Sequence, residues 1–191
     1  MTTSNVTQAG APDSVPQVTD AWLVIPLYNE ATVVREVISQ ARETFPYIVV
    51  VDDGSKDDSA RQAAAAGAIV VRHPVNLGQG AALQTGFSYI LEKTNANYVV
   101  TFDADGQHST TDAAAMVAAA REEELAVILG SRFLQGPSPV GRLKRLVLRT
   151  AAAVSSRTSG MHLTDAHNGL RVIRRDVLVQ LNLKQNRMAH A

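Results

Sequence analysis

The stretch that decides the fold is Val99–His108, which reads VVTFDADGQH. Four apolar or β-branched residues lead into two aspartates, Asp103 and Asp105, and an apolar run with polar residues and Gly behind it predicts a buried strand. Because alternate side chains of an extended segment point the same way, both carboxylates are expected to face one point at the strand's end. Such a pair suits Mg2+ or Mn2+, although these residues taken alone favour a solvated turn that caps the next helix.

Strands and helices alternate outward from this stretch. Strands are predicted at 21–26, 48–51, 68–71, 99–102, 126–129 and 170–173. Helices are predicted at 31–44, 57–66, 81–93, 111–124 and 141–157, with a short one after Arg175. This alternation predicts an α/β fold with a mostly parallel central sheet flanked by helices. Each polar cluster follows a strand directly, and in open α/β sheets the carboxyl ends of the strands form the ligand-binding edge.

Composition narrows the class of protein. The chain has 191 residues, 46% hydrophobic and 19% charged, which is enough for one domain with a sizeable core. Lys plus Arg equals Asp plus Glu at 18 each, so no net charge draws the chain toward nucleic acid. The absence of cysteine excludes disulfides and thiolate chemistry and fits a cytoplasmic location.

The domain organisation follows from the same patterns. Residues 1–20 are rich in Thr, Ser, Pro and Gln and are expected to form a disordered leader. Residues 21–191 are expected to form one domain, which either ends at residue 191 or is truncated there. No apolar run approaches the roughly 20 residues of a membrane-spanning helix.

Five motifs, taken together, resemble one family. They are P-x-Y-N-E at 26–30, D-D-G-S at 52–55, N-x-G-x-G at 76–80, D-x-D-x-Q-H at 103–108 and G-S-R at 130–132. Their order and spacing resemble the family 2 glycosyltransferases, which have the GT-A fold and use nucleotide diphospho-sugars. The later D-x-x-N-G-x-R at 165–171 resembles the subgroup that transfers mannose or glucose to dolichyl or polyprenyl phosphate.

The resemblance implies roles for individual residues. A ring at Tyr28 would stack near the base, Glu30 would contact the ribose and Asp53 would accept from a base N–H, whereas Asp52 holds the turn. The metal ligands implied are Asp103, Asp105 and Gln107, and His108 is read as a loop histidine with its own partners. The implied donor-binding set is Pro26, Tyr28, Glu30, Val51, Asp53, Asn76, Gly80, Asp103, Ala104 and Asp105.

The acceptor side is implied to involve Arg132, Asp165 and Arg171. Arg binds phosphate well because its planar fork matches oxyanions. A polyprenyl phosphate is already ionised at pH 7, so it needs positioning rather than a general base. Asp165 is either the base for a sugar-hydroxyl acceptor, as in other members of the family, or the organiser of its own turn.

Two further alternatives remain open. Residues 141–157 carry five basic residues and no acid, which fits either peripheral contact with an anionic membrane at its cytoplasmic face or an ordinary solvated helix. A non-catalytic module that binds sugar nucleotides or docks on membranes also fits the motifs. A sugar nucleotidyltransferase fits less well, because the first turn lacks a Gly-rich loop with Arg or Lys.

Overall fold

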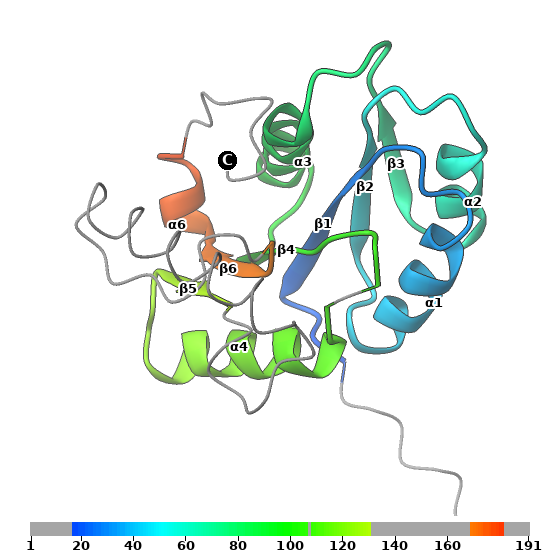
Figure 1. The fold of residues 1–191 in the computed structure, drawn as a ribbon. Helices are drawn as coiled ribbons and strands as arrows, with labels where there is room; N and C mark the ends of the chain where they lie inside the picture. The colour runs from blue at the N-terminus through cyan, green and yellow to red at the C-terminus, as the bar shows by residue number, and fades with distance from the viewer. Residues whose placement is uncertain (1–16, 107, 131–168, 182–191) are drawn as a thin grey trace, which may run out of the picture.

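The computed structural model describes residues 17–106, 108–130 and 169–181. Six described strands form one mixed sheet in the order β3-β2-β1-β4-β6-β5 (Figure 1). The strands are β1 (Ala21–Leu27), β2 (Ile48–Asp52), β3 (Ile69–Arg72), β4 (Tyr98–Thr101), β5 (Val127–Leu129) and β6 (Arg171–Arg174). β1 to β4 pair in parallel, and β6 runs antiparallel to both β4 and β5. The mostly parallel sheet predicted from the sequence is therefore confirmed.

Helices cover both faces of this sheet, as the sequence predicts. The described helices are α1 (Val34–Thr44), α2 (Ser59–Ala65), α3 (Gln79–Lys93), α4 (Thr110–Glu122) and α6 (Arg175–Leu178). One core lies between the sheet and α1, α2 and α4, while α3 and α6 enclose a second core on the other face (Figure 1). The predicted helix 141–157 lies outside the described residues.

β2 shows most clearly that the centre of the sheet is buried on both faces. Every residue of Ile48–Asp52 is buried, as its β-branched sequence predicts for a strand between two helical layers. Val49 belongs to one core and Val50 to the other, because successive side chains point to opposite faces. The two edge strands, β3 and β5, are the more exposed ones, and β2, β1 and β4 lie inside the sheet.

One helix boundary differs from the sequence prediction. α1 begins at Val34 rather than at 31, because residues 31–33 form a turn, in which the Ala31 N–H donates to Asp57 Oδ2 from the loop after β2. Residues 17–20, which precede β1, contact the domain: the Val18 N–H donates to Thr44 O at 2.8 Å, and Arg121 pairs with Asp20.

Candidate functional site

A cleft of about 450 Å3 lies at the carboxyl edge of the sheet. It collects residues that follow β1, β2, β3 and β4, where parallel strands of an α/β sheet are expected to bind ligands. Eight of the predicted donor-binding residues line it, and Leu27, Gly78, Gln79 and Ala82 join them. The eight are Pro26, Tyr28, Glu30, Asp53, Asn76, Asp103, Ala104 and Asp105.

The two aspartates of the D-x-D motif reach this cleft from a turn. β4 ends at Thr101, and Ala104 and Asp105 form a turn that Gly106 completes with φ +74°. The extended segment expected from the sequence is therefore wrong, because the glycine admits a left-handed backbone that folds the chain back. Asp103 and Asp105 nevertheless line the same cleft.

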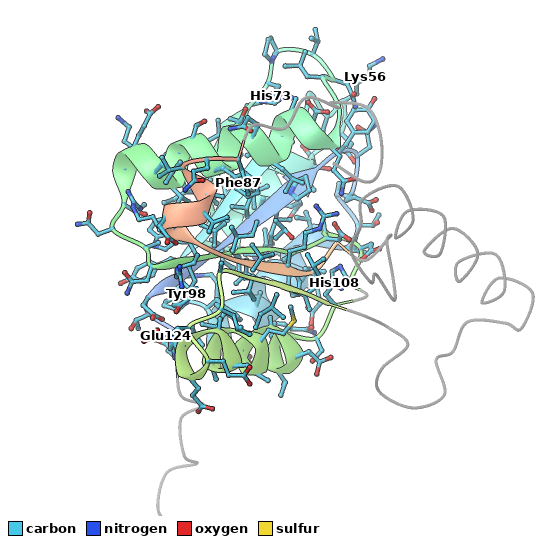
Figure 2. The ribbon with its side chains drawn as sticks, turned by 90° about the vertical axis from the view of Figure 1, so that its left-hand side faces the viewer. Lys56, His73, Phe87, Tyr98, His108 and Glu124 are labelled. Atoms are coloured by element: carbon cyan, nitrogen blue, oxygen red, sulfur yellow. The ribbon has the colours of Figure 1, made fainter. Side chains whose placement is uncertain are left out.

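The Asp103 carboxylate is held from two sides. His108 Nε2 lies 2.9 Å from Asp103 Oδ2, and the Gln79 side-chain amide donates to Oδ1 at 3.4 Å. The His108 side chain is largely buried, and its ring meets Phe102 edge-on at 5.5 Å. Figure 2 shows His108 at the end of the sheet opposite to Tyr98, where β4 begins. His108 thus has partners, as the sequence analysis expects, and one of them is Asp103.

β6 brings a distant part of the chain against Asp103. Thr101 pairs with Arg171 across the antiparallel ladder, and the Thr101 hydroxyl donates to the Gly169 carbonyl. Gly169 packs so closely that a Cβ at this position would lie 2.1 Å from Asp103 Oδ2. Only a residue without a side chain leaves this carboxylate in place.

Arg171 supplies a positive charge that acts on Asp103. Burial lowers the pKa of the Arg171 guanidinium, and the Asp103 charge acts in the opposite direction. An arginine stays protonated at neutral pH despite such a shift. A half-buried positive charge on β6 therefore acts on Asp103, although Arg171 does not itself line the cleft.

The other end of the cleft is built around Asp53. Its carboxylate accepts hydrogen bonds from the Leu77 N–H at 2.9 Å and from the Gly78 N–H at 2.7 Å. His73 Nδ1 lies 2.7 Å from Asp53 Oδ1, and His73 Nε2 lies 2.9 Å from the Thr85 hydroxyl. Asp53 therefore fixes the loop that carries Asn76, and it retains acceptor capacity because a carboxylate offers about four lone-pair sites.

Asp52 holds its own turn, as predicted. It is fully buried, and its Oδ1 accepts from the Ser55 N–H at 3.1 Å. Arg72 Nε lies 2.9 Å from Asp52 Oδ2, an ion pair that does not have hydrogen-bond alignment. This arrangement fixes the end of β2 beside the cleft.

The remaining predicted residues fall into two groups. Val51 is fully buried in β2 and Gly80 is buried in the first turn of α3, and neither lines the cleft. Gln107, Arg132 and Asp165 lie outside the described residues. Among the residues that the structure describes, no three His, Cys, Asp or Glu side chains converge on a metal position.

The sequence analysis did not assign a role to several residues that shape the site. His73 and Thr85 support Asp53, and Gln79 contacts Asp103. Gln79 could have been found from its place inside the N-x-G-x-G motif. His73 and Thr85 could not, since their pairing depends on how α3 packs against the sheet.

Comparison with known proteins places the chain in a family. The family model described as Glycosyl transferase family 2 matches residues 22–181, so the chain belongs to that family. It is 30% identical to the polyprenol monophosphomannose synthase of Mycolicibacterium smegmatis, over 84% of this chain and 64% of the relative. It is 27% identical to the UDP-N-acetylglucosamine–dolichyl-phosphate N-acetylglucosaminyltransferase of Methanococcus voltae, over 84% of this chain and 72% of the relative.

A solved structure gives the same fold. Glucosyl-3-phosphoglycerate synthase of Mycobacterium tuberculosis, in complex with Mn2+, UDP and glucosyl-3-phosphoglycerate, matches with a TM-score of 0.63 and 25% identity. The match covers 84% of this chain and 58% of that structure, so the chain spans little more than half the length of this neighbour. The fold is therefore the GT-A fold of this family. In the part of the chain that the structure describes, no helix is long and apolar enough to cross a bilayer.

Proposed function

We propose that this chain carries the donor site of an inverting glycosyltransferase that moves a sugar from a UDP- or GDP-linked donor to a polyprenyl phosphate. One observation carries the proposal: Asp103 and Asp105 line the same cleft as Tyr28 and Glu30. The first pair suits a diphosphate with a cation, and the second suits a nucleoside. The names of the relatives from M. smegmatis and M. voltae support the choice of a lipid phosphate as acceptor.

The cleft fits a divalent cation by the chemistry of its donor atoms. Two carboxylates offer the hard oxygen ligands that Mg2+ and Mn2+ prefer, and Gln107 is proposed as a third ligand. When bound, such an ion neutralises the charge of a diphosphate leaving group. Mn2+ is present in the complex of the mycobacterial synthase, which supports the use of a divalent ion.

The side chains of the site suit a single displacement. An oxygen of the acceptor phosphate bonds to the anomeric carbon while the bond to the diphosphate oxygen breaks, and the nucleoside diphosphate leaves. One in-line step inverts the anomeric configuration. Because the acceptor is already ionised, the reaction needs orientation and charge balance rather than a base. Arg171 beside Asp103 is suited to hold the incoming phosphate, and Arg132 is proposed to assist it.

The test is a reaction panel. The protein is incubated with Mg2+ or Mn2+ and a set of UDP- and GDP-sugars, with and without polyprenyl phosphate, while nucleotide release and lipid product are followed. The proposal expects release of one nucleotide that depends on the lipid phosphate. Transfer to a saccharide without lipid would favour a hydroxyl acceptor with Asp165 as base, and nucleotide binding without turnover would favour a binding module.

A further inference from the structure

The loop after β2 is bonded to the loop after β1 through a row of cross-chain contacts. The Asn29 N–H donates to Ser55 Oγ at 2.9 Å, and the Glu30 N–H donates to Ser59 Oγ at 2.8 Å. The Ala31 N–H donates to Asp57 Oδ2 at 3.2 Å. Three successive backbone donors of one loop are thus satisfied by three side chains of another.

These contacts go beyond the turn chemistry that Ser and Asp often supply. Side chains in such loops usually bond their own backbone two or three residues away. Here the partners are 26 to 29 residues apart in the chain. In return, the Lys56 N–H donates to Asn29 Oδ1 at 2.9 Å, so the two loops are bonded in both directions.

The loop that is held in this way has an uncommon backbone. Asn29 has φ +55°, a left-handed conformation that non-glycine residues adopt only when their surroundings favour it. It lies between Tyr28 and Glu30, which both line the cleft. The cross-chain hydrogen bonds therefore fix the direction in which these two cleft residues leave the backbone.

Asp57 and Ser59 hold the loop that carries Tyr28 and Glu30 from behind the cleft. Ser59 is fully buried, and neither residue lines the cleft. The Ser59 hydroxyl donates to Asp57 Oδ1, and this hydrogen bond holds the pKa of the Asp57 carboxyl below its ordinary value. Asp57 thus orients Ser59 while it binds Ala31 directly.

The same segment also contacts the opposite wall of the cleft. Gly54 has φ +74°, and a Cβ there would lie 2.7 Å from Val75 C and 2.8 Å from Asn76 N. Lys56 and His73 mark the two neighbouring loops on one side of the molecule (Figure 2). The segment 54–59 is therefore packed between the two loops that supply Tyr28 and Asn76.

We propose that Asp57 and Ser59 are positioning residues that set affinity for the donor nucleotide without touching it. This inference rests on the proposed function, since it takes the cleft to be the donor site. Loss of one of these hydrogen bonds frees the Tyr28–Glu30 loop to leave its bound geometry. The Michaelis constant for the donor is then expected to rise by about fivefold to tenfold. The turnover number should change little, because Asp103 and Asp105 belong to a different loop.

The experiment compares Ser59→Ala and Asp57→Ala with a matched control. Thr94→Ala removes a hydroxyl that also bonds two backbone groups, Ile90 O and Ala96 N, but between α3 and β4. Each variant is assayed in the full chain for melting temperature, and for kcat and KM with the UDP- or GDP-sugar that the unaltered protein uses. Asp57 is exposed, so we expect its variant to fold even if the buried Ser59 variant does not.

The expected result is a raised KM in the variants at 57 and 59 and an unchanged KM in Thr94→Ala at a comparable melting temperature. An unchanged KM in Asp57→Ala, or an equal rise in the control, would overturn the inference and leave the proposed function standing. Failure of the unaltered protein to bind any UDP- or GDP-sugar would overturn the proposed function, and the inference with it.

Discussion

Gly169→Ala is the substitution for which the structure gives the sharpest expectation. The added methyl would lie 2.1 Å from Asp103 Oδ2 and 2.6 Å from Asp103 Cγ, whereas ordinary contacts begin at 3.4 Å. The carboxylate must therefore move by more than an ångström or β6 must shift. Gly169 does not have a left-handed backbone, so the effect comes from space rather than from φ.

The size of the effect follows from what Asp103 does. A shift of that size breaks its 2.9 Å contact with His108 and moves one of the two proposed metal ligands. Disturbing the groups that orient a ligand typically costs tenfold to a hundredfold in metal affinity, so a loss on the order of tenfold or more is expected. Crowding itself should lower stability by about 1–3 kcal/mol.

The assay is a calorimetric titration of Mn2+ together with nucleotide, run beside thermal melting. Gly86→Ala is the matched control, because its Cβ would lie 2.4 Å from Val24 Cγ1 in the core behind α3. The control should lose stability and keep its metal affinity in the folded protein. If Gly169→Ala binds Mn2+ as the unaltered protein does, the placement of Asp103 against β6 is refuted.

Three other predictions concern two residues of the cleft and one residue behind it. Asp105→Ala should abolish metal-dependent nucleotide binding, and unchanged affinity in a calorimetric titration with Mn2+ would count against the metal assignment. Tyr28→Ala should weaken nucleotide binding by about tenfold, since a base stacked on an aromatic ring is worth roughly 1–3 kcal/mol, and leave Mn2+ binding unaltered. The depressed pKa of Asp57, held down first by its hydrogen bond from Ser59, means that its contribution to folding is present above the unfolded pKa and is lost as pH falls below about 4. Asp57→Asn should therefore flatten the acid limb of a melting-temperature profile, and an identical limb in both proteins would contradict this.

Much of the fold could be predicted from local patterns. The β-branched sequence of β2 predicts a strand buried on both faces, and all of its residues are buried. The position of each polar cluster after a strand predicts one shared edge, because parallel strands end together. Tyr28, Asp53, Asn76 and Asp103 accordingly meet in one cleft.

The order and direction of the last strands could not be predicted in this way. β6 lies between β4 and β5 and runs against both, which brings Gly169 onto Asp103 from 66 residues further along the chain. Hydrophobic pattern identifies a strand, but tertiary packing decides its neighbours. The sequence motif around 169 was visible, whereas its contact with the D-x-D turn was not.

The conformations of the loops could not be predicted from the sequence either. Serine in a loop usually bonds to nearby backbone, yet the Ser55 hydroxyl accepts from the Asn29 N–H, 26 residues away. Asp103 and Asp105 were expected on an extended segment, and Gly106 turns the chain instead. In both cases the local residues permit several conformations, and a partner distant in sequence selects one of them.

The proposed acceptor is tested most directly by following a labelled sugar. With the donor that the protein uses, a divalent cation, and either polyprenyl phosphate or the corresponding polyprenol, label is measured in the lipid fraction. The account predicts transfer to the phosphate and none to the polyprenol, because only the phosphate arrives ionised. Equal transfer to both lipids, or label recovered only in a soluble saccharide, would contradict it.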